Sequence, residues 1–356
     1  MSSVDPFEDF ELLSPILPQP AILDYLAWRH FVNEPAPIRP ALITMAAYQA
    51  MSNAERSKYN EQRRMYHARF GPIVTPSLKA VHEDALETAS VNYWAPPGAR
   101  TGLVLDGYGT LGKSTIITHL GRRYEQTVRR KQNLVGEELP NGNLYVPVVY
   151  INLPSKLTLK AFNRRAVNYF NIPAPLSADE DWLSERIIRA ASDCGTSLFI
   201  IDDVHFIKMG NRSGEAINNH LKWLANYISA TFVYAGIDLK GTKLFSEGAS
   251  REREATSQTK RRFKRFEISP FEDGSDEFLG LLAAFEQHLV LLKHEPGILT
   301  EKLAGYVYNR TNGFIGAISQ LVRGGALRAI LQGEERLSRP LLDKIILDYG
   351  AEEGRR

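Results

Sequence analysis

The chain has 356 residues, of which 44% are hydrophobic and 24% are charged, and its formal net charge is +2. This length predicts two or three domains, and the composition is that of a soluble globular protein. No run approaches the roughly 18 apolar residues of a membrane span, and the acidic start MSSVDPFEDF lacks the basic residues that begin a signal peptide, so none is expected. The single cysteine, Cys194, cannot form an internal disulfide, so we expect a cytoplasmic protein without membrane contact. The histidines show no ligand spacing with Cys or Asp, and no structural metal is expected.

The first part of the chain is predicted to be mainly helical. Ser52 and Glu55 fit a capping box that opens a charged helix, and Gly71-Pro72 stops this helix near residue 70. A second helix is expected to begin at Thr75-Pro76, because proline is favoured in the first turn. APPG (95–98) then marks the start of a different pattern.

The stretch DGYGTLGKST (106–115) fits G-x-x-x-x-G-K-[ST], the pattern of a phosphate-binding loop. Backbone N–H groups converge on phosphate oxygens only in such a tight Gly-rich turn. Lys113 would reach the β- and γ-phosphates, and the Ser114 hydroxyl would bind Mg²⁺. The apolar run GLVLD (102–106) before the loop and a helical apolar pattern after it favour a nucleoside triphosphate site over a chance Gly-rich turn. The expected nucleotide-binding residues are Gly107, Tyr108, Gly109, Thr110, Leu111, Gly112, Lys113, Ser114 and Thr115.

Strands and helices alternate after this loop. The expected strands are 103–106, 146–152, 197–202, 231–235 and 266–268, and the expected helices are 114–131, 158–170, 180–194 and 213–229. This alternation predicts a parallel sheet covered by helices on both faces, with ligands at the carboxyl ends of the strands. From Pro270 only helices are expected, at 275–293, 299–310, 314–331 and 339–348. The predicted domains are a helical N-terminal region with partner or oligomer contacts (1–95), an α/β nucleotide-binding domain (96–270) and a small helical domain (271–356).

The apolar strand in SLFIIDDVH (197–205) ends in two carboxylates. Asp202 is placed to hold the Mg²⁺ shell, and Asp203 is placed to orient or deprotonate the attacking water. Glu is the usual residue at the second position, and the shorter Asp203 predicts slow hydrolysis with unchanged binding. The alternative is that both residues only end a strand as turn-forming polar residues. Asp238, at the exit of the fourth strand, is a weaker polar candidate near the γ-phosphate, because Gly-Ile-Asp is also an ordinary turn.

A basic run, KRRFKR (260–265), precedes the last strand. An arginine here would reach a neighbouring subunit's γ-phosphate, because the planar guanidinium fork suits spread phosphoryl charge. The alternative is a solvated basic face of a helix, which is what most charge runs are.

Four passages together resemble the AAA+ ATPases, and within them the transposition regulators of the TniB/TnsC type, which are relatives of MuB. They are GLVLDGYGTLGKSTIITHLGRRY, VVYINLPSKLTLKAFNRRAVNYFNIP, LFIIDDVHFIK with the following HLKWLAN, and TNGFIGAISQLVRGGALRAIL. The resemblance covers about residues 50–335. It implies an AAA+ P-loop NTPase with a five-stranded parallel sheet, a helical N-terminal region and a small α-helical C-terminal lid.

The resemblance also implies a function. A protein of this type is an ATPase, with ATP and Mg²⁺ as cofactors, that forms a ring or helical filament on target duplex DNA without sequence preference. It recruits or activates an integrase-type transposase, and slow hydrolysis then drives disassembly. Carried over, Gly107–Thr115 is Walker A, Asp202 and Asp203 are Walker B, and Arg262 is the favoured arginine finger, with Arg261 and Arg265 as alternatives. Many AAA+ lids carry a sensor arginine in G-x-x-R, but this chain has Gly313-Phe314-Ile315-Gly316.

The expected DNA contacts lie in NLPSKLTLKAF (152–162), since this region lines the inner surface of the oligomer in related ATPases. Lys156, Thr158 and Lys160 at a helix start favour phosphate without reading base identity. The alternative is that they are solvated residues of an amphipathic helix, and the basic run at 122–131 (Arg122, Arg123, Arg129, Arg130 and Lys131) is then the next candidate. Two other functions remain open, a nucleotide-gated signalling or defence switch and a helicase loader that binds single strands.

Overall fold

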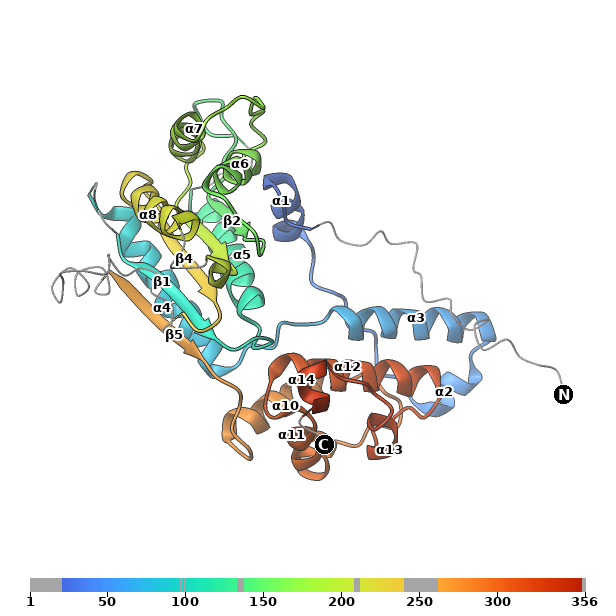
Figure 1. Ribbon diagram of the computed structural model, residues 1–356. Coiled ribbons are helices and arrows are strands. Elements are labelled where there is room, and N and C mark those ends of the chain that lie inside the picture. The colour runs from blue at the N-terminus through green and yellow to red at the C-terminus, as the bar shows by residue number, and fades with distance from the viewer. Residues whose placement is uncertain are drawn as a thin grey trace.

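The computed structural model describes residues 21–353, except 97, 99, 133–137, 208–211 and 240–261. Figure 1 shows two lobes, an α/β lobe around a sheet and a helical lobe at the C-terminal end of the chain. Each lobe has its own cluster of buried hydrophobic side chains.

The α/β lobe is built on one five-stranded parallel sheet in the order β2-β3-β4-β1-β5. The strands are β1 (Gly102–Gly107), β2 (Val148–Asn152), β3 (Leu198–Asp202), β4 (Thr231–Gly236) and β5 (Phe263–Ile268). The predicted parallel sheet is therefore confirmed, including the fourth strand beside the strand that leads into the Gly-rich loop. The continuous apolar runs of β1–β4 are buried on both faces, as parallel strands require.

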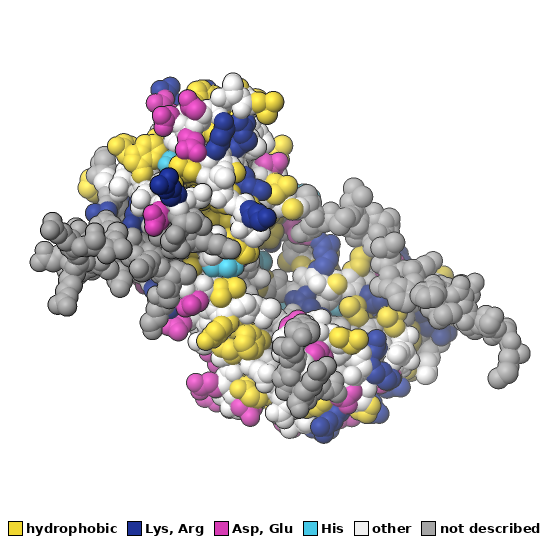
Figure 2. Space-filling view, in the orientation of Figure 1, with side chains coloured by type: hydrophobic (Ala, Val, Ile, Leu, Met, Phe, Trp, Pro, Cys, Tyr) yellow, Lys and Arg dark blue, Asp and Glu magenta, His cyan; other side chains and the backbone are white. Residues whose placement is uncertain are grey.

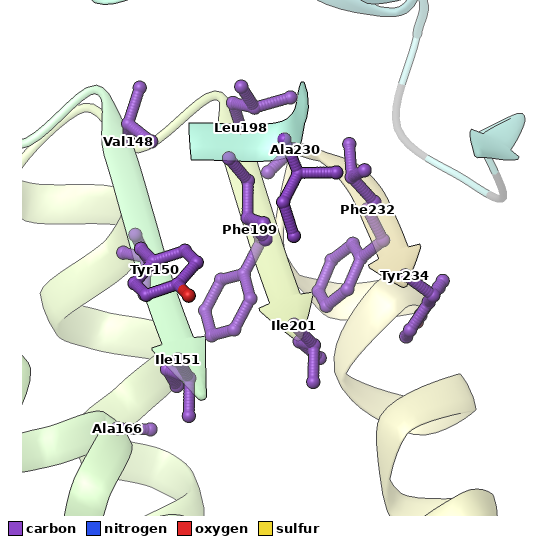
Figure 3. Packing of buried hydrophobic residues seen from close by; sticks show 14 of the residues in the cluster. Val148, Tyr150, Ile151, Ala166, Leu198, Phe199, Ile201, Ala230, Phe232 and Tyr234 are labelled. Carbon is purple, nitrogen blue, oxygen red and sulfur yellow. The ribbon is translucent and has the colours of Figure 1, made fainter. Parts of the chain in front are cut away.

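Aromatic side chains fill much of the space over this sheet. Figure 3 shows Tyr150, Phe199 and Phe232 projecting from the neighbouring strands β2, β3 and β4. The rings of Phe199 and Phe232 stack with their centroids 4.9 Å apart. This packing fixes the central strands and so the positions of the polar residues at their carboxyl ends.

Helices follow the strands as predicted: α5 (Lys113–Lys131), α6 (Leu159–Tyr169), α7 (Glu180–Asp193) and α8 (Arg212–Tyr227). The helix α5 contacts β1, β2, β3 and β4, and α6 packs against β2, α7 and α8. A short helical turn, η1 (Val204–Phe206), follows β3. Thr158 and Asp179 begin α6 and α7 by accepting hydrogen bonds from backbone N–H groups of the first turn.

The helical lobe contains α10 (Asp276–His288), η2 (Ile298–Lys302), α11 (Ala304–Thr311), α12 (Ile315–Leu331), α13 (Arg339–Leu342) and α14 (Tyr349–Glu353). The predicted helix 339–348 is wrong, because α13 ends at Leu342. The Arg310 guanidinium binds the carbonyl oxygens of Leu342 and Ile345 at 3.2 and 2.8 Å, so these two carbonyls are paired where the chain leaves the helix. The predicted helix 275–293 also ends early, at His288, since the backbone of Val290 bonds to side chains of another helix.

That other helix belongs to the N-terminal part of the chain, which contains α1 (Tyr25–Asn33), α2 (Met45–Ala50), α3 (Asn53–Arg69) and α4 (Pro76–Trp94). The capping box of Ser52 and Glu55 is confirmed at the start of α3. Helices α1 and α4 pack against α5 and the sheet, whereas α3 packs along α12 of the helical lobe. Whether residues 1–95 act as a unit of their own stays a prediction, because these helices divide between the two lobes.

Buried ion pairs attach α3 to the helical lobe and α1 to the α/β lobe. The Arg63 guanidinium on α3 forms a bidentate pair with Glu335, at 2.6 and 2.9 Å, and both side chains are almost fully buried. On the α/β lobe, Glu125 of α5 is fully buried and accepts hydrogen bonds from Trp28 and Arg29 of α1. Among the helices of the described residues, none has the length and apolarity needed to cross a bilayer.

Candidate functional site

The Gly-rich loop lies between the end of β1 and the start of α5, at the carboxyl edge of the sheet. Two of its glycines have a clear geometric reason. Gly112 has φ of 76°, a left-handed conformation that L side chains rarely adopt. A Cβ on Gly107 would lie 2.4 Å from the carbonyl oxygen of Ile268 on the adjacent strand β5. The loop therefore closes tightly over the helix N-terminus, as a phosphate-binding turn requires.

Lys113 is the first residue of α5 and its side chain is 8% exposed. Its ammonium group donates to the carbonyl oxygen of Gly107 at 2.9 Å and to that of Tyr108. Burial lowers the pKa of Lys113, and the nearby carboxylates of Asp202, Asp106 and Asp203 oppose that shift. The structure thus holds a buried cation inside the loop, where the γ- and β-phosphates of a nucleotide would compete for it.

The two carboxylates at the end of β3 are placed differently. Asp202 is 1% exposed, and its carboxylate accepts hydrogen bonds from the Tyr150 hydroxyl at 3.0 Å and from the Asp203 amide at 2.9 Å. Burial raises the pKa of Asp202, whereas a hydrogen bond from the Ser114 hydroxyl lowers it. Asp202 and Ser114, the two predicted magnesium ligands, are therefore brought together.

Asp203 turns the chain sharply, with φ of 58°. Its carboxylate accepts a hydrogen bond from the Asn152 side-chain amide at 2.8 Å, across from the end of β2. Asp is enriched in this left-handed conformation, which gives a physical reason for Asp at a position where Glu is more common. His205 lies 3.9 Å from the same carboxylate.

Asp106 is a further buried carboxylate that the sequence analysis did not single out. It is 2% exposed, and it accepts hydrogen bonds from the Leu239 amide at 2.8 Å and from the Arg265 guanidinium at 2.6 Å. These contacts join the start of the loop to the turn after β4, where Asp238 has φ of 48°, and to β5. An acidic residue directly before the first glycine of the loop was the available signal.

A cavity of about 580 Å³ extends from the loop toward the helical lobe. Gly112 and Thr115 line it together with the apolar Ile73 and Phe271 and the acidic Glu267. Its size lies within the usual range for small-molecule sites. The sequence analysis missed the part of this cavity outside the loop, since its residues come from the α3–α4 turn, the end of β5 and α12.

The Gly313-Phe314-Ile315-Gly316 turn brings the helical lobe onto the loop. The Gly316 amide donates to the Thr110 carbonyl oxygen at 3.1 Å, and a Cβ on Gly316 would lie 2.8 Å from that oxygen. Gly313 has φ of 73°, and a Cβ there would lie 2.1 Å from the carbonyl oxygen of Phe271. Both glycines are needed for close approach, so a side chain at either position would push α12 off the α/β lobe.

The candidates for the arginine finger differ in their surroundings. Arg262 is exposed directly before β5, at the amino edge of the sheet, and its carbonyl oxygen accepts from the Gly102 amide at 2.8 Å. Arg265 is bound to Asp106 of the same chain. Arg261 lies outside the described residues.

The predicted DNA contacts lie on the turn after β2 and at the start of α6. Lys156, Thr158 and Lys160 are all exposed, and Thr158 is the N-terminal cap of α6. β2 is the edge strand of the sheet, so this turn lies at the rim of the α/β lobe.

The alternative basic run on α5 does not form one surface. Arg129 is buried against Glu125 at 2.9 Å. Arg122 and Arg123 line a groove of about 840 Å³ between α1, α3, α4 and α5, together with Arg69. Figure 2 shows Lys and Arg side chains along the hollow between the two lobes. Arg130 and Lys131 are exposed at the far end of α5.

The sequence matches the family described as bacterial TniB protein over residues 81–273. No curated protein matches the chain significantly.

Among solved structures, the chain is similar to the Aeropyrum pernix ORC1 protein in complex with DNA, with 15% identity and a TM-score of 0.55 over 80% of this chain and 66% of that chain. It is also similar to the ADP form of the Aeropyrum pernix ORC2 protein, with 14% identity and a TM-score of 0.58 over 80% of this chain and 71% of that chain. The chain thus spans about two thirds of the length of these structures. These likenesses confirm the predicted fold, that of an AAA+ P-loop ATPase.

Proposed function

The chain belongs to the TniB family of bacterial proteins, and from this membership we propose that it is an ATP-dependent AAA+ regulator of transposition. In this proposal it assembles on target duplex DNA, recruits or activates an integrase-type transposase, and is disassembled by ATP hydrolysis. The observation that carries the proposal is that the Gly-rich loop brings Lys113 next to Asp202 and also carries the contact with Gly316 of the helical lobe.

In this proposal ATP binds with its phosphates at the loop and its base in the cavity of about 580 Å³, where Ile73 and Phe271 supply apolar lining. Lys113 would exchange its two carbonyl contacts for phosphate oxygens, which gain more from a buried cation than neutral carbonyls do. Ser114 and Asp202 supply oxygen ligands, the kind that Mg²⁺ prefers. Two such ligands would leave the other positions of the ion to phosphate oxygens and water, as is usual for Mg²⁺.

Asp203 is the residue proposed to orient the attacking water. Its backbone is fixed by the left-handed turn, and Asn152 holds its side chain at 2.8 Å. A fixed carboxylate next to the loop is suited to accept a proton from water. Bound Mg²⁺ would neutralise charge on the phosphates, and Asp203 would act on the water alone.

Arg262 is proposed to complete the site of a neighbouring subunit. Phe263, the next residue, pairs with Gly102 at the start of β1, whereas the loop begins at the other end of that strand. The five residue steps of β1 separate them by about 16 Å at roughly 3.3 Å per residue. This distance exceeds the reach of an arginine side chain toward its own loop, so a catalytic role requires a second subunit. Hydrolysis would then occur only in assembled subunits, and it would determine when the assembly comes apart.

Nucleotide binding is tested with Lys113→Ala, which removes the buried cation of the loop. We expect loss of ATP binding in equilibrium titrations with a fluorescent ATP analogue. Lys131→Ala, at the exposed end of the same helix, is the matched control and should bind as the parent does. Unchanged affinity in Lys113→Ala would show that the loop is not a nucleotide site.

Assembly on DNA is tested by negative-stain microscopy with duplex DNA and a non-hydrolysable ATP analogue. Rings or filaments on DNA, absent without nucleotide, are expected. Assembly that needs the nucleotide but not DNA would favour a signalling switch, and assembly on single strands alone would favour a helicase loader.

The DNA surface is tested with the double variant Lys156→Ala, Lys160→Ala. It should lose duplex binding about equally for all sequences, with a shallower salt dependence, and should keep its ATP affinity. The double variant Lys79→Ala, Lys302→Ala removes the same charge from two lysines that are each 64% exposed elsewhere, and it is the control. Equal DNA affinity in both double variants would place the contact surface elsewhere.

A further inference from the structure

Arg323 lies on α12, seven residues after Gly316, and it lines the same cavity. Residues seven apart share one face of a helix, so Arg323 stands two turns beyond the contact of α12 with the Gly-rich loop. Its side chain is half-buried, and its guanidinium does not point toward the loop but toward the end of α3.

The Arg323 guanidinium binds the last carbonyls of α3. Its Nη1 donates to the carbonyl oxygens of Ala68 and His67 at 2.8 and 3.3 Å, and its Nη2 donates to that of Phe70. The guanidinium carbon lies 4.3 Å from the centroid of the Phe70 ring. Carbonyls at a helix C-terminus have no partner within the helix and carry partial negative charge, so a cation from another helix is favoured there.

Ser319, one turn earlier on α12, binds the same guanidinium. Its hydroxyl accepts from Arg323 Nε at 2.9 Å, and Ser319 also lines the cavity. Every N–H-bearing nitrogen of the guanidinium is therefore engaged, which fixes its position. Burial also lowers the pKa of Arg323, as expected for a charge held between two helices.

The segment after these carbonyls forms the apolar wall of the cavity. Gly71 has φ of 109°, and a Cβ there would lie 3.0 Å from Arg323 Nη2. Pro72 and Ile73 follow directly and line the cavity, and Ile73 is only 8% exposed. Arg323 therefore ties this segment to α12, and both line the cavity.

We infer that Arg323 is a positioning residue for the base of the bound nucleotide. It acts through the Phe70–Ile73 segment, which it holds against α12 so that the base fits between them. The inference rests on the proposed nucleotide site. It assigns Arg323 to the part of the cavity next to Pro72 and Ile73, while Gly316 stands where many AAA+ lids carry the sensor arginine of a G-x-x-R motif.

The experiment compares two ligands that share the phosphate chain, ATP and inorganic tripolyphosphate, by calorimetric titration. Only ATP has a base. Arg323→Gln removes the charge from the α3 carbonyls, so we expect ATP affinity to fall about tenfold, the size of one charge-assisted hydrogen bond. Tripolyphosphate affinity should not change, since Lys113 and the loop are untouched. The ATP affinity of Arg323→Lys should lie between those of the parent and of Arg323→Gln, because a point charge cannot bind three carbonyls in a fixed fork.

Arg328→Gln is the matched control on the same helix, because Arg328 donates to the Lys344 carbonyl oxygen at 2.6 Å, away from the cavity. It should bind both ligands as the parent does. An equal loss of ATP and tripolyphosphate affinity in Arg323→Gln would overturn the inference, since it would mean that Arg323 only keeps the lobes together. Unchanged ATP affinity would overturn it as well. A parent protein that binds neither ligand would instead overturn the nucleotide site itself.

Discussion

The Gly316 amide donates a 3.1 Å hydrogen bond to the Thr110 carbonyl oxygen, and this contact joins the first turn of α12 to the Gly-rich loop. Thr110 itself has φ of 57°, so the contact meets the loop at a residue with a left-handed backbone. A shift of the Thr110 carbonyl group would therefore break or move this contact with α12.

Gly316→Ala should weaken this contact. The new Cβ would lie 2.8 Å from the Thr110 oxygen, so α12 must move away from the loop. We expect the affinity for ATP to fall about tenfold, because the hydrogen bond between α12 and the loop is lost. Calorimetric titration with ATP measures this affinity. Gly280→Ala on α10 meets no atom within 4 Å and is the control, which should bind ATP normally and gain up to about 1 kcal/mol of stability. Normal affinity in Gly316→Ala would show that the contact with α12 does not influence the site.

Asp203→Asn should keep ATP bound but slow its turnover by about 10²–10⁴-fold, since an amide does not accept a proton from water. Asn also tolerates the left-handed backbone at φ of 58°, so the turn should persist. Phosphate release measured at saturating ATP distinguishes turnover from binding. Parent-like turnover would mean that Asp203 is structural and that another residue positions the water.

Arg262→Ala subunits should bind ATP yet lose about 10³-fold or more of their turnover, the contribution typical of an arginine finger. Mixing them with Lys113→Ala subunits should restore part of the activity, because each supplies what the other lacks across the boundary. Arg189→Ala, whose side chain is 72% exposed on α7, is the control and should hydrolyse ATP normally. If no mixing ratio restores activity, the site is not shared between subunits.

Stability should fall as the pH drops below about 6.5, because of His67. Burial lowers the pKa of His67 to about 4, and its Nε2 accepts from the Val290 amide at 3.1 Å only in the neutral form. The unfolded chain therefore binds more protons than the folded chain between pH 4 and 6.5, and the free energy of unfolding rises with pH in that window. His67 contributes a slope of about 1.4 kcal/mol per pH unit. Urea unfolding of the parent and of His67→Gln at pH 5 and pH 7 measures the difference in slope, and equal slopes would exclude His67 as its source.

The Gly-rich loop, the paired aspartates and the caps of α3 and α4 could be predicted because each depends on neighbours in sequence. Ser52 and Glu55 satisfy each other within one turn, and the spacing of Gly107, Gly112 and Lys113 is itself the loop geometry. The attachment of α3 to the helical lobe could not be predicted in this way. Arg63 looks like a surface residue of a charged helix, and its partner Glu335 is 272 residues away. The part of the cavity outside the loop escaped notice for the same reason, since its walls come together only in the folded chain.

The contacts of the buried Glu125 make α1 part of the folded α/β lobe. The residues matched by the family begin at 81, but Trp28 and Arg29 of α1 supply two partners of this carboxylate. The Trp28 ring also lies so close to α5 that a Cβ on Gly121 would be 2.8 Å from it. A fragment cut to the matched segment would remove both of these partners of Glu125, keep its ion pair with Arg129 on α5, and open an apolar face to water. Expression boundaries, tags and fusions should therefore be chosen upstream of α1 rather than at the edge of the matched segment.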